Sequence, residues 1–198
     1  MKRKIFLAFI LCAVMLLVTG CGDKFKFKHG SWDMKTYTSE YFGIKATVES
    51  DWDISDDRSL STDNKISDMS DSSIEKLFKD KGSFHEMKAL KPNGDNINIF
   101  VYDTEKLTSY TKDNYFTIYK DALDKDYGSR LMHSKITKDS VNFLGKNTDC
   151  LRVESTVYGT TVYEFKIPIF DERYTANISL STTDKYRLNE LASMFSAI

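Results

Sequence analysis

The sequence predicts an α+β fold in which an antiparallel β-sheet meander is packed with helices. Segments of alternating apolar and polar residues follow one another through short turns, which is typical of antiparallel strands. Helical periodicity occurs between and after these segments rather than in βαβ alternation. The chain of 198 residues is 41% hydrophobic and 13% aromatic, which suffices for one globular core and excludes a disordered chain.

The first twenty residues have the pattern of a secretory signal peptide. Met1-Lys2-Arg3-Lys4 places three positive charges before the apolar run 5–18, and the small residues Thr19 and Gly20 follow. This run is shorter than the roughly 20 apolar residues that a membrane-spanning helix needs. We therefore expect residues 1–20 to be removed as a signal peptide, and an uncleaved anchor helix is the alternative.

Val18-Thr19-Gly20-Cys21 resembles the bacterial lipobox. That resemblance implies that the thiol of Cys21 receives a diacylglyceryl group and that cleavage occurs just before it. Two acyl chains would hold the protein stably on a bilayer. The expected location is the extracytoplasmic face of a bacterial cell membrane, with ordinary secretion as the alternative.

Residues 21–31 are expected to form a lipidated tether in which cations alternate with aromatic residues. Such alternation is also typical of a half-buried strand, so a first strand or a plain tether is one interpretation. In the other, lysines attract anionic headgroups while phenylalanines lie at the membrane interface. The residues predicted to contact the membrane surface are Lys24, Phe25, Lys26, Phe27 and Lys28.

Residues 32–198 are expected to form a single globular domain. Apolar residues alternate with polar ones over 42–48, which predicts a strand. The segments 84–91 and 96–103 flank Pro92-Asn93-Gly94-Asp95, a turn signal, and predict a β-hairpin. Helical spacing predicts an amphipathic helix over 111–127, closed by Gly128.

The remaining third of the chain predicts four strands and a final helix. The strands are expected at 134–141, 148–158, 162–170 and 174–181, joined by tight links into an antiparallel meander. Thr183 or Asp184 can cap a helix in which Leu188, Leu191, Ala192, Phe195 and Ile198 form one apolar stripe.

The segment 49–75 has nine acidic and two basic residues, many serines and few aliphatic residues. We expect an exposed acidic loop that ends in a short helix near 72–79. Asp51, Asp53 and Asp56 lie within this loop and resemble the opening of a calcium loop. The glycine and the bidentate glutamate of that motif are missing, so a calcium site of another design competes with a solvated loop.

Other chemistry-bearing residues have no motif around them. His29, His85 and His133 do not have metal-ligand spacing and are expected to be hydrogen-bonded or at the surface. Cys150 lies inside a predicted strand, where a partly covered and unreactive thiol is expected. Phosphate-binding loops and nucleophile elbows are absent from the sequence, no cofactor is implied, and its charge does not favour nucleic acid as a partner.

The order of elements resembles the PsbP-like family. The resemblance rests on the run 37–55 with its turn Tyr41-Phe42-Gly43 and Trp52, then a helix, a four-strand meander and a closing helix. It implies an α/β/α sandwich and a non-enzymatic binding or accessory module for an envelope or protein partner. No catalytic residue is carried over. A small extracytoplasmic hydrolase with an unrecognised site is the alternative.

Overall fold

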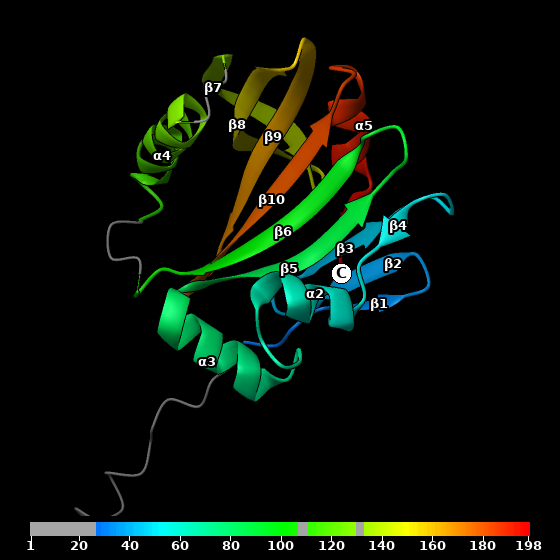
Figure 1. The fold of residues 1–198 in the computed structure, drawn as a ribbon, viewed down its shortest axis with the longest axis vertical. Coiled ribbons are helices and arrows are strands. Elements are labelled where there is room, and N and C mark those ends of the chain that lie inside the picture. Colours follow the sequence, from blue (N-terminus) through cyan, green and yellow to red (C-terminus); the bar gives the residue numbers. More distant parts are fainter. Residues whose placement is uncertain (1–26, 107–110, 130–132) are drawn as a thin grey trace, which may run out of the picture.

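A computed structural model describes residues 27–106, 111–129 and 133–198 (Figure 1). The larger of its two sheets is antiparallel throughout, with the strand order β4-β5-β6-β10-β9-β8-β7. Its strands are β4 (Asp53–Ile54), β5 (Ser83–Leu90), β6 (Asn96–Asp103), β7 (His133–Phe143), β8 (Lys146–Val157), β9 (Thr160–Phe170) and β10 (Tyr174–Thr182). The predicted hairpin and the predicted meander are both confirmed.

A smaller antiparallel sheet has the order β1-β2-β3-β11. Its strands are β1 (Ser31–Asp33), β2 (Thr36–Ser39), β3 (Ile44–Thr47) and β11 (Phe195–Ala197). The strand predicted over 42–48 is thus confirmed as β3. The apolar stripe at the end of the chain was wrongly expected to be wholly helical, because α5 (Arg187–Ser193) ends early and β11 then pairs with β3.

The acidic segment contains more regular structure than the expected loop. It holds β4, the helix α2 (Asp57–Asn64) and the start of α3 (Asp71–Lys81). Asp56 caps α2 by accepting a hydrogen bond from the backbone N–H of Ser59, and Ser70 caps α3 in the same way. The expectation that this segment is a loop is therefore wrong, although most of its residues are exposed and its predicted closing helix is present as α3.

The two faces of the large sheet pack against different elements. On one face, a large core joins the sheet to the small sheet, α2, α3 and α5. On the other face, the helix α4 (Tyr115–Ser129) covers a smaller cluster that contains Ile136, Leu151 and Val153 (Figure 1). Helices on both faces of an antiparallel sheet confirm the predicted α+β class.

Candidate functional site

The predicted lipidation site Cys21 and three residues of the predicted membrane contact, Lys24, Phe25 and Lys26, lie outside the described residues. Phe27 is 2% exposed and belongs to the main core, so its expected contact with the membrane is wrong. Lys28 is exposed and forms an ion pair with Glu40 at 3.2 Å. The globular body therefore includes Phe27, which precedes the expected start at residue 32.

Phe27 is held by an aromatic cluster at one end of the domain. Its ring centroid lies between 5.1 and 6.1 Å from five other rings. These rings belong to Tyr41, Phe42, Phe78, Phe84 and Tyr174. Tilted and edge-on contacts of this kind stabilise aromatic pairs beyond the area that they bury. The chain is thus fixed to the body at Phe27, within the predicted tether 21–31.

Glu86 fixes the next residues of the same segment. A register shift in β5 between His85 and Met87 leaves Glu86 with no exposed surface. Its Oε1 accepts hydrogen bonds from the backbone N–H of Gly30 at 2.7 Å and from the Tyr37 hydroxyl at 2.5 Å. A buried carboxylate with several donors is stabilised, whereas an unpaired one would be strongly unfavourable.

His29 joins this buried carboxylate to the surface. Its Nδ1 lies 2.9 Å from Oε2 of Glu86, and its Nε2 lies 3.4 Å from Oδ1 of Asp57 in α2. Burial lowers the pKa of His29, but the two carboxylates more than offset this effect, so the pKa is raised above its ordinary value. The protonated form of His29 is therefore favoured in the fold.

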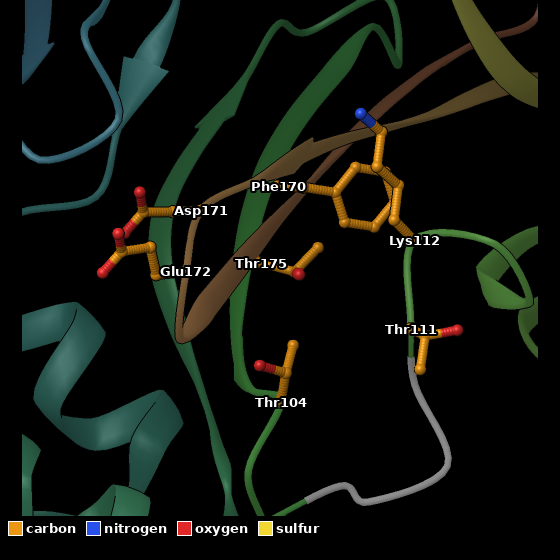
Figure 2. Close-up of a pocket in the computed structure, with 7 residues that line it drawn as sticks. All are labelled: Thr104, Thr111, Lys112, Phe170, Asp171, Glu172 and Thr175. Atoms are coloured by element: carbon orange, nitrogen blue, oxygen red, sulfur yellow. The ribbon is translucent and has the colours of Figure 1, made fainter.

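A cavity of about 240 Å³ opens at the β9–β10 turn (Figure 2). Asp171 and Glu172 lie on one side of it, and Thr111 and Lys112 lie on the other. Phe170, Thr104 and Thr175 complete its lining. The cavity adjoins the Phe27 cluster, since the hydroxyl of Tyr41 donates a hydrogen bond to Asp171 at 2.5 Å.

The lining of this cavity suits binding better than catalysis. It offers one amine, two carboxylates and three hydroxyls, of which the Thr104 hydroxyl donates to the carbonyl of Arg173 at 2.6 Å. Among its described lining residues no nucleophile stands beside a general base. Such a cavity can hold a small polar group that carries charge of either sign.

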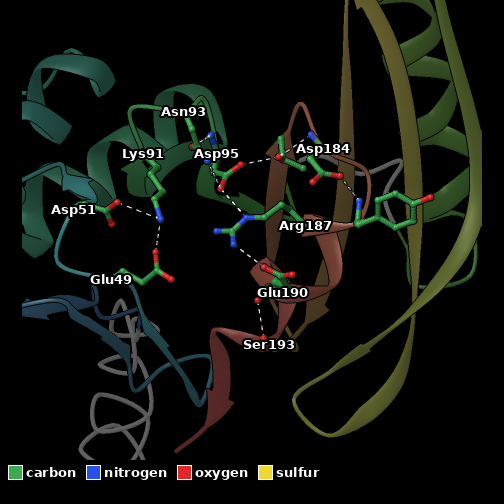
Figure 3. A network of polar contacts seen from close by, with 11 residues as sticks. Glu49, Asp51, Lys91, Asn93, Asp95, Asp184, Arg187, Glu190 and Ser193 are labelled. Carbon is green, nitrogen blue, oxygen red and sulfur yellow. Dashed lines mark hydrogen bonds and ion pairs between the residues drawn. The ribbon is translucent and has the colours of Figure 1, made fainter.

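A polar network joins the turn of the β5–β6 hairpin to the start of α5 (Figure 3). Asp95 has a 2% exposed side chain and accepts hydrogen bonds from Thr182 at 2.6 Å and Arg187 at 3.1 Å. Burial raises the pKa of Asp95, but hydrogen bonds from Thr182 and Asn93 and the charge of Arg187 outweigh it, so the pKa is lowered. This network stabilises the junction of hairpin and helix.

Two of the three candidate calcium ligands have other structural roles. Asp51 forms an ion pair with Lys91 at 3.2 Å, which Lys91 shares with Glu49 (Figure 3). Asp56 caps α2, and Asp53 lies in β4. In the part of the chain that the structure describes, no three His, Cys, Asp or Glu side chains form a group that could hold a metal ion. The candidate calcium site of Asp51, Asp53 and Asp56 is therefore not formed among the described residues.

The predicted environments of the histidines are confirmed. His29 is hydrogen-bonded as described above, and His133 is exposed. His85 stacks on Phe100 with ring centroids 4.3 Å apart, and its Nε2 lies 2.9 Å from Oδ1 of Asn98. Its Nδ1 lies 3.8 Å from Asp63. Burial lowers the pKa of His85.

Cys150 is more deeply buried than expected. The thiol has no exposed surface, and burial raises its pKa to about 12. Leu151 and Val153 belong to the smaller cluster, whereas Cys150 belongs to the main core, so these residues alternate between the two faces of the sheet. A protonated thiol without access to solvent is a poor nucleophile.

Sequence reasoning did not find the Glu86 cluster or the Asp95 network. Glu86 is followed by the buried Met87, which breaks the alternation of β5, but the sequence alone does not separate a bulge from a change of face. Its partner His29 is 57 residues away. The turn residues around Asp95 were recognised, but their contact with Arg187 spans 92 residues.

The chain matches no family model and no curated protein. Among solved structures it is similar to the solution structure of cyanobacterial PsbP (CyanoP) from Synechocystis sp. PCC 6803. The two share 10% sequence identity over 87% of this chain and 99% of that chain, with a TM-score of 0.49. Likeness at this level carries nothing about activity, ligand or partner. No helix in the described ranges is long and apolar enough to span a bilayer.

Proposed function

We propose that this protein is a membrane-anchored extracytoplasmic lipoprotein that acts as a non-enzymatic binding or accessory module for a protein or envelope partner. The lipobox-like residues ending at Cys21 support the anchor. The observation that carries the proposal is the fixation of Phe27, His29 and Gly30 in the body. A lipid at Cys21 would thereby hold one defined end of the domain beside the bilayer.

The length of the intervening chain limits how far the body can lie from its anchor. Five residues, 22–26, separate Cys21 from the buried Phe27. A fully extended chain spans at most 3.3–3.6 Å per residue, so the two residues lie within about 20 Å of each other. The end of the domain that contains Phe27, α3 and the β9–β10 turn would therefore face the membrane.

The described side chains favour binding over the hydrolase alternative. Hydrolysis by a protein nucleophile needs that nucleophile within hydrogen-bond reach of a base. Both ring nitrogens of His29 face carboxylates, and Cys150 is buried in the core. The cavity at the β9–β10 turn supplies complementary charges and hydroxyls instead. No specific observation favours the hydrolase.

The anchor is tested by comparing the full chain with its Cys21→Ser variant. The membrane fraction of the producing cells is separated, and the intact mass of the protein is measured. We expect the full chain in the membrane fraction with the added mass of a lipid, and Cys21→Ser in the soluble fraction. Cys150→Ser is the matched control and should remain lipidated. Equal fractionation of all three would contradict the anchor.

A further inference from the structure

The cavity at the β9–β10 turn is lined by charges of both signs that have no ion-pair partner among the described residues. The carboxylate of Asp171 accepts one hydrogen bond, from the hydroxyl of Tyr41. The side chains of Glu172 and Lys112 form neither an ion pair nor a hydrogen bond with another described residue. Figure 2 shows the two carboxylates on one wall and Lys112 on the opposite wall. Both walls are therefore available to a ligand.

A buried hydroxyl lies between these two walls. Thr175 in β10 is 3% exposed, and its side chain lines the cavity (Figure 2). No described residue forms a hydrogen bond with the hydroxyl of Thr175. A hydroxyl that is withdrawn from water without a partner is unfavourable, so a ligand that accepts this hydrogen bond would be favoured.

Two further cavities among the described residues lack this combination. In the cavity beside α5, Arg187 is already paired with Glu190 at 2.6 Å. In the cavity beside α3, the hydroxyls of Ser67 and Ser73 both donate to Asp68. A buried lining hydroxyl without a partner therefore distinguishes the cavity at the β9–β10 turn.

Neighbouring residues do not alter the charge of this cavity. Residues 107–110, which lie outside the described ranges, have the uncharged sequence Leu-Thr-Ser-Tyr. Arg173 pairs with Asp103 at 3.0 Å, and neither Arg173 nor Asp113 lines the cavity. The cavity thus presents two negative charges opposite one positive charge.

The cavity lies at the end of the domain that the proposed anchor would hold beside the bilayer. Tyr41, which donates to Asp171, packs on Phe27 with ring centroids 5.1 Å apart. The eleven residues of β9 lead from this end to the turn at Tyr158 and span about 35 Å at roughly 3.3 Å each. This length exceeds the reach of about 20 Å between Cys21 and Phe27, so the cavity is at the end nearer to the lipid.

We propose that this cavity binds the ethanolamine headgroup of a membrane phospholipid. The ammonium group lies between Asp171 and Glu172, and the phosphate lies beside Lys112 and the hydroxyl of Thr175. The inference rests on the proposed membrane anchor and names a ligand for the proposed binding module. A primary ammonium has three N–H donors for the two carboxylates, and a phosphate accepts hydrogen bonds from an amine and a hydroxyl.

Two other phospholipid headgroups match the walls of the cavity less well. The headgroup of phosphatidylglycerol offers no cation to the two carboxylates. The trimethylammonium group of phosphatidylcholine is positively charged but has no N–H to donate, so it forms no charge-assisted hydrogen bond. The cavity should therefore select phosphatidylethanolamine over both.

The exposed ion pair between Lys28 and Glu40 provides matched controls at the same end of the domain. Glu172→Gln and Lys112→Gln each remove one charge from the cavity, whereas Glu40→Gln and Lys28→Gln remove the same charges outside it. Thr175→Val removes the hydroxyl. This last change should leave the free energy of unfolding unchanged or raise it, because the hydroxyl has no partner among the described residues.

The test titrates the purified full chain in detergent with short-chain phosphatidylethanolamine, phosphatidylcholine and phosphatidylglycerol, and native mass spectrometry measures the bound lipid. We expect phosphatidylethanolamine to bind at least about tenfold more tightly than the other two lipids. Each of the three cavity variants should weaken this binding by at least about fivefold, and each control variant by less than about twofold.

Three results would overturn the proposal. They are equal binding of the three lipids, equal losses in the cavity and control variants, and equally tight binding of glycerophosphoethanolamine, which would indicate a soluble ligand. The intact mass of the same protein separates this inference from the anchor. A lipidated chain without selective binding would overturn the headgroup site and leave the anchor intact. A chain without lipid that still selects phosphatidylethanolamine would contradict the anchor and leave the headgroup site in place.

Discussion

His29 and Glu86 are 57 residues apart in the sequence, yet Nδ1 of His29 lies 2.9 Å from Oε2 of Glu86 inside the domain. This contact joins the segment nearest the predicted lipid to the irregular strand β5. The neighbouring Gly30 and Tyr37 donate to the other oxygen of the same carboxylate. A lipid anchor on the preceding segment would therefore be connected directly to the core of the domain and would fix its orientation.

Replacing Glu86 by Gln should destabilise the fold strongly. The substitution keeps the shape but removes the charge that strengthens the hydrogen bonds from Tyr37 and Gly30 and the pairing with His29. We expect the free energy of unfolding in urea to fall by about 2–4 kcal/mol. Glu172→Gln at an exposed position should change it by less than about 0.5 kcal/mol. Equal effects would contradict the importance of the buried carboxylate.

His29 should make the stability of the N-terminal segment depend on pH. Because its folded pKa is raised above the ordinary 6.5, its contribution is complete below that pH and is lost as pH rises through the folded pKa. His29→Gln should therefore lower the melting temperature more in mildly acidic than in alkaline buffer. The exposed His133→Gln serves as the control for removing a histidine. A larger loss of melting temperature in alkaline buffer would contradict the raised pKa of His29.

Gly30 should tolerate no side chain. A Cβ at this position would overlap the phenol of Tyr37 and lie 2.8 Å from the carbonyl oxygen of Thr38. Gly30→Ala is expected to cost about 1–3 kcal/mol in thermal or urea unfolding. In contrast, Gly128→Ala in α4 meets no atom within 4 Å and should gain about 0.5–1 kcal/mol. A neutral Gly30→Ala would contradict the close packing around Glu86.

Cys150 should be unreactive in the folded protein. In the chain of residues 22–198 it is the one cysteine of the sequence. Because it is buried and its pKa is raised to about 12, a thiol reagent at neutral pH should modify it only after unfolding. Reaction in guanidinium provides the fully accessible reference. Rapid modification without denaturant would show that β8 opens or that the thiol is exposed.

Much of the large sheet could be predicted from the sequence, because its strands have distinct faces. In β6, Ile97, Ile99 and Val101 are buried and alternate with partly exposed residues, which gives the period of two that marks a strand. The turn residues between β5 and β6 predicted the hairpin that these two strands form. The pairing of β6 with β10 joins segments that are far apart in the sequence. A local sequence pattern cannot predict such a pairing.

The acidic segment shows where composition was misleading. Its abundance of serine and aspartate suggested a loop, yet those residue types also begin helices, as Asp56 and Ser70 do here. The few apolar residues of α2 and α3 are enough to attach both helices to the core. Leu60, Ile74, Leu77 and Phe78 are buried on the inner faces of these helices. Capping residues followed by helically spaced apolar residues were the signal that could have found both helices.

The contacts that define the candidate site were beyond local patterns. The burial of Phe27 depends on a pocket built from α3, β5, β10 and the turn before β3. The sequence pattern of alternating lysine and phenylalanine is the same whether a phenylalanine ring enters this pocket or faces a membrane. The pattern alone therefore could not predict the burial of Phe27.

The most direct test of the proposed orientation is the distance from the bilayer to each end of the anchored domain. In a Cys150→Ser background, a fluorophore on a cysteine at position 172 or 158 is read in vesicles that carry a quencher on the lipid headgroups. Lipid on Cys21 keeps that residue from labelling. The proposed tether predicts strong quenching at position 172 and little at position 158. Equal quenching at both positions, or stronger quenching at position 158, would contradict it.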